Sequence, residues 1–281
     1  MSELLKSRKE LGEFAEKVRK ALGREKVRAL VCAGTGCVAN GSLKVYERLR
    51  ELVASRGLFI DLDTALDACG SAPATCGDGK PGEGPDDGEE CRDADVSGNE
   101  DKHAAGEKFM GAVGVATSGC HGFCQMGPLV RIEPRGILYV RVKPEDVEEI
   151  VEKTLVRGEV IERLLYHDPV EGKVAPTEDS IPFYKRQVRV ALANCGRINP
   201  EDIRESIASG GYQAIAKVLE EMTAEQVIEV VSASGLRGRG GAGFPTGRKW
   251  SFARAINSDK KYVICNGDEG DPGAFMDRSA M

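Results

Sequence analysis

The hydrophobic pattern of the chain opens with an amphipathic helix. Leu4, Leu11, Phe14, Val18 and Leu22 recur near helical spacing. We therefore predict an N-terminal helix within residues 1–25. The segment has no apolar signal core and no small-residue cleavage site, and no apolar run in the chain approaches the roughly eighteen residues that span a bilayer. We expect a cytoplasmic protein that reaches the inner face of a membrane only through its partners.

Strand-sized and helix-sized patterns alternate through residues 26–157. Predicted strands cover 26–31 and 58–63, begin again at Gly111, and cover 129–134 and 136–142. Predicted helices cover 42–57 and 144–156, and the second opens with Pro144, Glu145 and Asp146, which suit a helix N-terminus. This order predicts a small α/β domain with a mixed sheet.

The periodic pattern is lost between residues 64 and 106, where Gly, Pro, Asp and Glu dominate. A loop longer than about 15 residues is usually functional or disordered, and this composition favours disorder. Two interpretations remain open for this insert. It is either a disordered acidic surface loop or a small metal or partner-docking site, whose candidate ligands are Cys69, Cys76, Cys91 and His103.

Charge is concentrated in the same insert. The chain is 41% hydrophobic and 30% charged and carries a net charge of −6. Residues 78–101 contain ten acidic and two basic side chains, a local charge of −8, so that the rest of the chain carries +2. The acidic insert repels polyanions, and we expect no nucleic-acid partner.

Residues 158–198 contain few periodic apolar positions and three prolines, and we predict a linker that wraps a surface. Helices are predicted next, at 199–211, 212–222 and 223–235. The last helix opens with Thr223 and Gln226 in a capping-box arrangement. Residues 261–265 are predicted to form a strand that ends in an acidic, Gly-rich loop. The expected domains are therefore the helix 1–25, the α/β domain 26–157 with the insert 64–106, the linker 158–198 and a further unit 199–281.

Four of the nine cysteines form two matched pairs. In a reducing cytosol, cysteines indicate metal binding or catalysis rather than disulfides. Cys32-x4-Cys37 and Cys120-x3-Cys124 each lie in a Gly-rich loop directly after a predicted strand. Two such loops can bring four thiolates together on one iron–sulfur cluster. Glycines allow the tight turns and close backbone approach that this requires, at positions 34, 36, 119 and 122.

Two other interpretations of the quartet remain open, structural zinc and incidental thiols. Zinc sites more often use C-x2-C knuckles, so that the wider spacings disfavour zinc. A thioredoxin-type redox pair needs C-x-x-C, which is absent here. Cys195 and Cys265 are expected to be buried small residues.

The segments CAGTGCVANGS and SGCHGFCQMGPLVRIEP resemble the thioredoxin-like [2Fe-2S] ferredoxins. The resemblance is strongest to ferredoxin domains fused to the front of NADH-oxidising flavoprotein subunits. These are the 51 kDa-type subunit of complex I and the beta subunits of NAD-linked hydrogenases. The resemblance implies a thioredoxin-like fold and a [2Fe-2S] cluster bound by Cys32, Cys37, Cys120 and Cys124.

A second Gly-rich loop lies near the C-terminus, at Gly238 to Trp250. It has five glycines in ten residues, followed by Arg248 and Lys249. Backbone N–H groups in such a loop can approach phosphates, with a cation nearby. The loop matches neither the P-loop nor the Rossmann fingerprint. A flexible loop and an Arg/Gly-rich nucleic-acid tail remain as alternatives, although such tails lack the strand-forming and acidic context that follows here.

SGLRGRGGAGFPTGRKWSF followed by YVICNGDEGDPGAFMDRS resembles the signature of the complex I NADH-binding flavoprotein. The resemblance implies an α/β domain that binds FMN and NAD(H), with Phe244 and Phe252 stacked on the dinucleotide. Asp271 stands where many relatives have Glu. The cofactor performs the chemistry, so no catalytic side chain is expected. The candidate cofactor-binding residues are Gly238, Arg239, Gly240, Gly241, Gly243, Phe244, Lys249, Phe252, Asn266, Asp268, Glu269 and Asp271.

Members of this family continue further and carry a [4Fe-4S] cluster whose ligand run is absent from this chain. We therefore expect a fragment of a longer subunit, inactive by itself. The expected function is NADH dehydrogenase-type electron transfer, from NAD(P)H to FMN and through iron–sulfur clusters to a hydrogenase or a quinone- or ferredoxin-linked module. Expected partners are other redox subunits, including a small [2Fe-2S] subunit. The alternatives are a stand-alone [2Fe-2S] electron relay without NADH chemistry and a zinc-stabilised scaffold.

Overall fold

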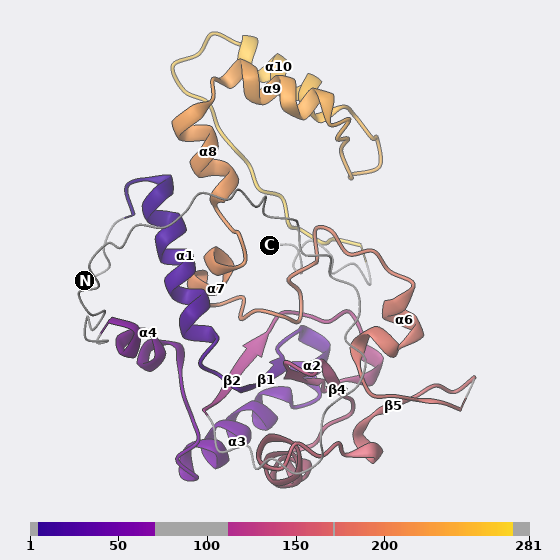
Figure 1. The fold of residues 1–281 in the computed structure, drawn as a ribbon. Coiled ribbons are helices and arrows are strands. Elements are labelled where there is room, and N and C mark those ends of the chain that lie inside the picture. Colours follow the sequence, from indigo (N-terminus) through magenta and orange to yellow (C-terminus); the bar gives the residue numbers. More distant parts are fainter. Residues whose placement is uncertain (1–4, 71–111, 171, 272–281) are drawn as a thin grey trace, which may run out of the picture.

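The structure is a computed structural model that describes residues 5–70, 112–170 and 172–271 (Figure 1). Its first half contains a four-stranded sheet with helices on both faces. The elements up to the end of this sheet are α1 (Arg8–Leu22), β1 (Val27–Cys32), α2 (Thr35–Ala39), α3 (Ser42–Ser55), α4 (Leu62–Gly70), β2 (Val113–Ser118), the 3-10 turn η1 (Cys124–Met126), β3 (Val130–Glu133) and β4 (Ile137–Tyr139).

The strands follow the order β2-β1-β3-β4. β1 and β2 are parallel, with Val27 opposite Val113 and Cys32 opposite Ser118. β3 is antiparallel to β1, and β4 is antiparallel to β3. A parallel pair needs a crossover connection, and α3 lies within it. This mixed sheet, with one helix after β1 and another after β4, is the thioredoxin-like arrangement and confirms the predicted fold class of the first domain.

One face of the sheet forms the main hydrophobic core. Successive side chains of a strand point to opposite faces, so Val27, Ala29 and Val31 of β1 share this face. They pack against α3, whose inward residues Leu49 and Val53 are fully buried. The helical segment after β4 completes the layer. It runs continuously through a 3-10 turn η2 (Pro144–Asp146), α5 (Val147–Glu149) and a π-helical stretch η3 (Ile150–Val156), and confirms the helix predicted at 144–156.

The other face of the sheet carries Arg28, Leu30 and Cys32 of β1, and residues from after the first domain cover it. Leu138 of β4 packs there against Ile181 and Tyr184. Residues 158–198, expected to form a linker, contain short elements that contribute to this layer. They are η4 (Glu162–Leu164), β5 (Tyr166–His167), β6 (Val174–Ala175), η5 (Glu178–Ser180) and α6 (Pro182–Lys185), with β5 and β6 paired as an antiparallel ribbon.

The strand predicted at 58–63 is wrong. Only Phe59 forms a bridge, with Val113, and α4 begins at Leu62. Val113 N–H donates to Leu58 O and Ile60 N–H donates to Val113 O, so this segment pairs with β2 only at Val113, the first residue of that strand. The expectation of disorder at residues 64–70 is likewise wrong, since they belong to α4. The rest of the insert, with Cys76, Cys91 and His103, lies outside the described residues, as does the side chain of Cys69.

Helices follow in the last part of the chain, and three of them lie in the ranges predicted at 199–235. These three are α7 (Ile203–Ala208), α8 (Gln213–Glu221) and α9 (Ala224–Ala233), and α10 (Thr246–Ala255) comes after them. α7 packs on α1 through Ile207, Leu11 and Ala15. α9 and α10 pack together as a lobe that rises from the body, and α8, whose Glu221 pairs with Arg8 of α1, leads into it (Figure 1). The capping box is confirmed, because Thr223 Oγ1 accepts from Gln226 N–H at 3.3 Å and Gln226 Oε1 accepts from Thr223 N–H at 2.8 Å.

Two expectations for the C-terminal part are corrected. Residues 261–265, predicted to form a strand, are extended but pair with no other strand among the described residues. An alternating pattern alone does not make a strand, because its backbone groups need a partner. Cys265, expected to be buried, is exposed.

α10 was not predicted from the sequence. In the described parts of the chain, no helix is long and apolar enough to cross a membrane.

Candidate functional site

The structure brings Cys32, Cys37, Cys120 and Cys124 together at one edge of the sheet. β1 and β2 are parallel, so that their carboxyl ends lie side by side. Cys32 is the last residue of β1, and Cys120 follows β2 by two positions. Cys37 lies in α2 rather than in an open loop, and Cys124 begins η1. The Cys32 thiol is within hydrogen-bond reach of Cys37 and Cys120, and the Cys120 thiol is within reach of Cys124.

Close approach of the two loops depends on glycine. A Cβ placed on Gly34 would lie 2.9 Å from the Cβ of Cys120 and 3.2 Å from its Cα. One on Gly36 would lie 3.2 Å from the Cβ of Cys124. Gly127 was missed in the sequence analysis, although a Cβ there would lie 2.5 Å from the Cys37 Sγ. Its place three residues after Cys124, before Pro128, was the available signal.

The thiols perturb one another because they are crowded and largely buried. A hydrogen bond from the Cys120 thiol acts to lower the pKa of Cys32. The Cys37 thiol and burial act in the opposite direction and outweigh it, so that the pKa of Cys32 rises to about 11. The Cys32 thiol and the backbone of Leu129 lower the pKa of Cys37. Four thiolates so close together repel one another unless positive charge lies between them. This donor set therefore fits a cationic group.

The close approaches between the thiols run from Cys37 through Cys32 and Cys120 to Cys124, and they therefore join the two loops. In the described ranges, no three His, Cys, Asp or Glu side chains surround a point where a single metal ion could sit. A two-iron cluster takes two thiolates on each iron. Backbone N–H groups also point at the sulfurs, as in the 3.3 Å contact from Gly122 N–H to Cys120 Sγ. The residues thus fit a [2Fe-2S] cluster.

His121, between Cys120 and Cys124 of the second loop, is held from both sides. Its Nε2 lies 2.9 Å from Ser118 Oγ, and its side chain is buried. On the other side Gly196 approaches so closely that a Cβ would lie 2.6 Å from His121 Nδ1. Burial, followed by the nearby arginines, lowers the pKa of His121 to about 3, so that the ring is neutral. The segment around Gly196 therefore helps to fix the second cysteine loop.

A cavity of about 550 Å³ lies beside the quartet. Cys120 and Cys124 line one wall, and residues of the segment 191–206, including Cys195, line the other. Cys195, expected to be buried, is partly exposed in this cavity. The cysteine edge of the sheet therefore opens onto a partly open cavity, whose other wall comes from residues 191–206.

The second Gly-rich loop is closed at its base. Gly238 N–H donates to Phe244 O and Thr246 N–H donates to Leu236 O, each at 2.9 Å. The φ angles of Gly241 and Gly243 are +96° and +60°, a region that favours glycine. Gly247 permits close packing of α10 on α9, since a Cβ there would lie 2.8 Å from Ser232 Cα. The loop is thus a defined turn between two packed helices.

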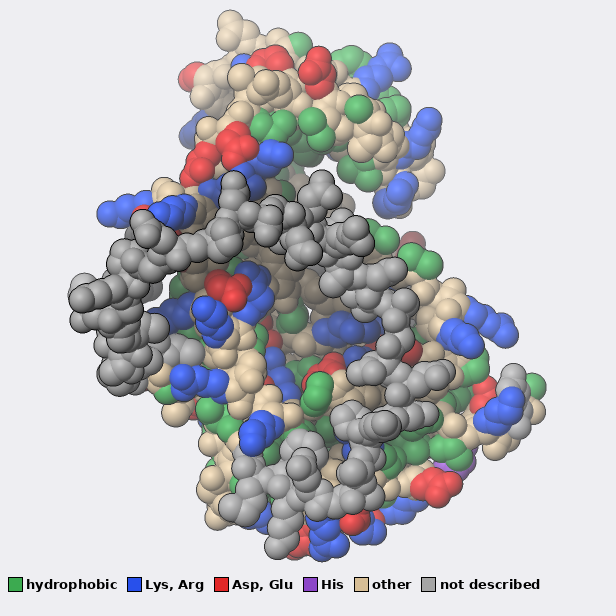
Figure 2. All heavy atoms as spheres, in the orientation of Figure 1, with side chains coloured by type: hydrophobic (Ala, Val, Ile, Leu, Met, Phe, Trp, Pro, Cys, Tyr) green, Lys and Arg blue, Asp and Glu red, His purple; other side chains and the backbone are tan. Residues whose placement is uncertain are grey.

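Side chains of the candidate flavin site are exposed around this loop. Phe244 and Phe252 are 44% and 55% exposed and lie close together, with ring centroids 6.4 Å apart. The guanidinium of Arg248 lies 5.4 Å from the Phe252 ring, and Lys249 is exposed on the same helix. Figure 2 shows Lys and Arg side chains at the outer end of the lobe that α9 and α10 form. The exposed cations suit an anionic ligand.

The remaining candidate residues lie in the extended segment after α10. Asn266, Asp268 and Asp271 are exposed, and Glu269 is half-buried with a φ of +50°. Asn266 Oδ1 accepts from Asp268 N–H at 3.1 Å, which makes a local turn. These side chains are not gathered into a pocket in the way the cysteines are.

Residues 231–281 match the family model of the Nuo51 FMN-binding domain. This match confirms the resemblance of the C-terminal segment to the complex I flavoprotein. Among curated proteins, the chain is 56% identical over 97 residues to the NADP-reducing hydrogenase subunit HndC of Solidesulfovibrio fructosivorans, covering 34% of this chain and 19% of that protein. It is 42% identical over 101 residues to the mitochondrial NADH-ubiquinone oxidoreductase 51 kDa subunit of Neurospora crassa, covering 34% of this chain and 20% of that protein.

Among solved structures, the chain is similar to a thioredoxin-like [2Fe-2S] ferredoxin from Aquifex aeolicus. The identity is 26% and the TM-score 0.29, covering 50% of this chain and 95% of the ferredoxin. The chain spans about a fifth of the length of the two curated relatives described above.

Proposed function

We propose that the chain is part of an NADH dehydrogenase-type electron-transfer subunit. In this proposal, Cys32, Cys37, Cys120 and Cys124 bind a [2Fe-2S] cluster, and residues 238–271 contribute to a site for FMN and NAD(H). The observation that carries the proposal is the convergence of four thiols at the ends of β1 and β2, in a chain whose residues 231–281 match the Nuo51 FMN-binding domain.

Bound FMN accepts a hydride from NADH and releases electrons singly, and the protein binds and orients it. The roles proposed for the chain are those of a binding site. Backbone N–H groups of Gly240 and Gly241 would face the phosphate, and Lys249 would compensate its charge, while Gly238 would hold the base of the loop through its bond to Phe244 O. Phe244 and Phe252 would offer aromatic faces for the dinucleotide, and Asn266, Asp268, Glu269 and Asp271 would accept from hydroxyl groups. Arg239 and Gly243 shape the loop.

The electron acceptor is proposed to be another redox subunit, belonging to a hydrogenase or to a complex I-like assembly in the cytoplasm. HndC is named as a subunit of an NADP-reducing hydrogenase, and the Neurospora crassa protein as the 51 kDa subunit of an NADH-ubiquinone oxidoreductase. Both relatives thus work within larger assemblies, which supports a subunit role.

A second candidate function is a [2Fe-2S] relay or docking module that has no NADH chemistry of its own. The contrast in burial favours it for the chain as it stands, because Cys32 and Cys37 are buried whereas Phe244, Phe252 and Lys249 are exposed. A relay needs only the cysteine site.

Cofactor analysis of the purified chain tests the proposal. Iron, acid-labile sulfide and flavin are measured on the wild-type chain, on Cys120→Ser and on the control Cys195→Ser. We expect two irons and two sulfides in the wild type and the control, an altered EPR spectrum or loss of iron in Cys120→Ser, and FMN binding on titration. A colourless chain without sulfide contradicts both candidate functions. An iron–sulfur chain that binds no FMN supports the relay.

A further inference from the structure

Tyr184 of α6 has a hydroxyl group that is buried and has no hydrogen-bond partner among the described residues. The side chain as a whole is 5% exposed. A buried hydroxyl without a partner costs about 1–3 kcal/mol, and such groups are rare in folded proteins. The group therefore calls for a partner other than the side chains and backbone that the structure describes.

The Tyr184 ring packs in the same cluster of buried side chains as Cys32 and Cys37. Burial raises the pKa of the Tyr184 phenol well above its usual range, and nearby Arg189 acts in the opposite direction. The thiols of Cys32 and Cys120 add to the rise. The unpartnered hydroxyl thus belongs to a ring that packs with the cysteines of the first loop and touches Phe123 of the second.

Neighbouring groups hold the Tyr184 ring in place. It meets the ring of Phe123 edge to face, at 5.6 Å and 73°, and that of Phe183 at 5.0 Å and 76°. The guanidinium of Arg189 lies 5.1 Å from the centre of the ring. Phe123 itself lies between the ligands Cys120 and Cys124 and stacks on Phe183 at 5.0 Å. The ring is enclosed by aromatic and cationic neighbours, so the hydroxyl group cannot swing out to water without unpacking α6.

We propose that Tyr184 donates a hydrogen bond to a sulfur atom of the iron–sulfur cluster and thereby sets its reduction potential. The inference rests on the proposed function, since it assumes a [2Fe-2S] cluster on the quartet. The phenol is neutral and a donor, whereas cluster and cysteine sulfurs are acceptors. Reduction adds negative charge to the cluster, so a donor at sulfur stabilises the reduced form more than the oxidised form.

The test is a redox titration of the cluster, followed by EPR, in the wild type and in Tyr184→Phe. At the potential where the wild-type cluster is half reduced, we expect the ratio of reduced to oxidised cluster in Tyr184→Phe to fall roughly three- to tenfold. A tenfold change corresponds to about 59 mV for one electron. An unchanged ratio at full iron content overturns the proposal.

Tyr166→Phe is the matched control. Tyr166 belongs to the same aromatic group, with its ring 5.4 Å from Phe123, but its hydroxyl is not one of the buried unpartnered groups. The control is expected to keep the wild-type ratio. If both variants shift the ratio equally, the effect belongs to aromatic packing and the proposal is wrong.

If the Tyr184→Phe variant fails to retain iron, a second measurement tests the same hydrogen bond. Site-specific replacement of Tyr184 by a fluorotyrosine keeps the hydroxyl and makes it more acidic, and therefore a stronger donor. The ratio of reduced to oxidised cluster is then expected to rise, and an unchanged ratio overturns the proposal.

The iron and sulfide content of the wild type distinguishes failure of the proposed function from failure of the Tyr184 proposal. A wild-type chain without the cluster refutes the proposed function and this inference together, whereas an intact cluster indifferent to residue 184 refutes this inference alone.

Discussion

Gly34 leaves almost no space between the two cysteine loops. A methyl group at this position would meet the Cβ and Cα of Cys120, which belong to a short side chain and the backbone and cannot simply rotate away. The site is therefore sensitive to a single added carbon atom in a residue that binds nothing itself.

We predict that Gly34→Ala lowers the iron content of the purified chain and destabilises it by about 1–3 kcal/mol, as for overpacking elsewhere in proteins. Gly12→Ala is the matched control, because Gly12 lies within α1 and a Cβ there meets nothing within 4 Å. The control should keep its iron and gain slightly in stability through helix propensity. Iron analysis and thermal melts check both variants. Full iron loading of Gly34→Ala would show that the loops can separate freely.

Glu25 is the residue whose environment most clearly makes stability depend on pH. Its carboxyl packs on the backbone of β2, where a Cβ on Gly114 would lie 2.2 Å from Glu25 Oε2. Burial raises the pKa of Glu25 to about 7, although Arg28 acts in the opposite direction. Glu205 shares Arg28 and adds to the rise. One cation thus faces two carboxyl groups.

Because the pKa of Glu25 is higher in the folded than in the unfolded chain, the folded chain binds more protons between pH 4.5 and about 7. The free energy of unfolding should therefore fall as pH rises through this window, by up to about 3 kcal/mol from this group. Glu25→Gln should remove that contribution and be the more stable chain above pH 7. Denaturant midpoints at pH 5 and pH 7.5 measure this, with the exposed Glu47→Gln as control. An equal pH dependence in Glu25→Gln and wild type contradicts the assignment.

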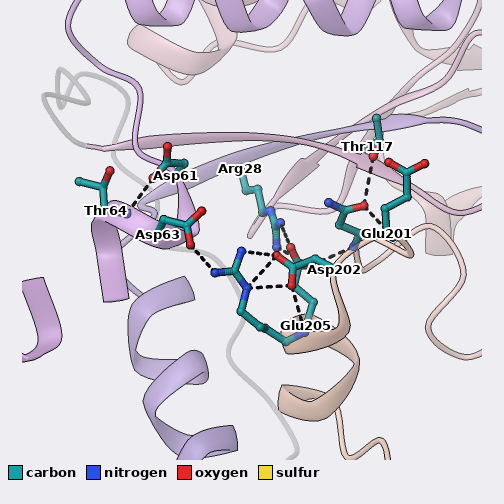
Figure 3. A network of polar contacts seen from close by, with 10 residues as sticks. Arg28, Asp61, Asp63, Thr64, Thr117, Glu201, Asp202 and Glu205 are labelled. Atoms are coloured by element: carbon teal, nitrogen blue, oxygen red, sulfur yellow. Dashed lines mark hydrogen bonds and ion pairs between the residues drawn. The ribbon is translucent and has the colours of Figure 1, made fainter. Parts of the chain in front are cut away.

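At the scale of elements, buried ion pairs attach the later segments to the second face of the sheet. Arg28 of β1 pairs with Glu205 of α7 at 2.5 Å (Figure 3). Arg131 of β3 pairs with Glu178 of η5, and both side chains are almost fully buried. Each pair joins a strand to a segment that follows the first domain. An arginine on the buried face of a strand therefore needs a carboxylate, which another part of the chain must supply.

We predict that Glu205→Ala releases α7 from the sheet. Glu205 accepts hydrogen bonds from Arg28 and from Asn199 N–H, the latter at 2.9 Å, and both donors would lose their acceptor. The cost should be about 3 kcal/mol, at the lower end of the range for a broken buried pair because Arg28 keeps Glu25. Limited proteolysis between residues 199 and 212 should accelerate. Glu201→Ala, a change to an exposed neighbour, should leave the cleavage rate unchanged. Equal cleavage of the two variants would mean that packing on α1 alone holds α7.

The elements with a clear period could be predicted from the sequence. β1, α3 and β2 carry buried residues at the spacing that their structure requires, as in the series Val45, Leu49 and Val53. The segment at 58–63 also alternates, but only Phe59 has a partner on β2, so its pairing depended on a tertiary contact that the pattern does not contain. α10 was hidden because glycines and Pro245 surround its first turn, while its packing on α9 through Gly247 stabilises it.

The convergence of the four cysteines was predictable for a related reason. Each pair begins directly after a strand that the hydrophobic pattern identifies, and the matched spacing of the two pairs marks them as a set. The packing of Tyr184 against the cysteines could not be predicted, because Tyr184 lies in a segment without periodicity and approaches them only through the fold. Residues 158–198 were expected to wrap a surface, but their composition does not indicate that Ile181 and Glu178 become fully buried there.

At the scale of the whole molecule, the proposed cluster connects segments that are distant in the chain. Its ligands come from β1, α2, the loop after β2 and η1, and α6 packs against them. A group bound only by the folded chain adds its binding free energy to stability.

We predict that removing iron from the loaded chain lowers the melting temperature by about 5 °C or more. Cys195→Ser should show the same difference between loaded and iron-free protein, since Cys195 is outside the quartet. Cys120→Ser should show little or none. Calorimetry of the three chains, before and after chelation, provides the measurement. Equal melting temperatures for loaded and iron-free wild type would mean that the cluster contributes nothing to folding.

The parallel pairing of β1 with β2 has a consequence for how this chain tolerates insertions. The two cysteine pairs are brought together by the hydrogen bonds between neighbouring strands, and the crossover between those strands includes residues 71–111. Loop-closure entropy grows only slowly, by about 0.6 kcal/mol for each doubling of length. The length of the crossover can therefore change greatly while the four thiols keep their places. New sequence can therefore be added to this crossover, beside the proposed redox centre, without rebuilding the centre itself.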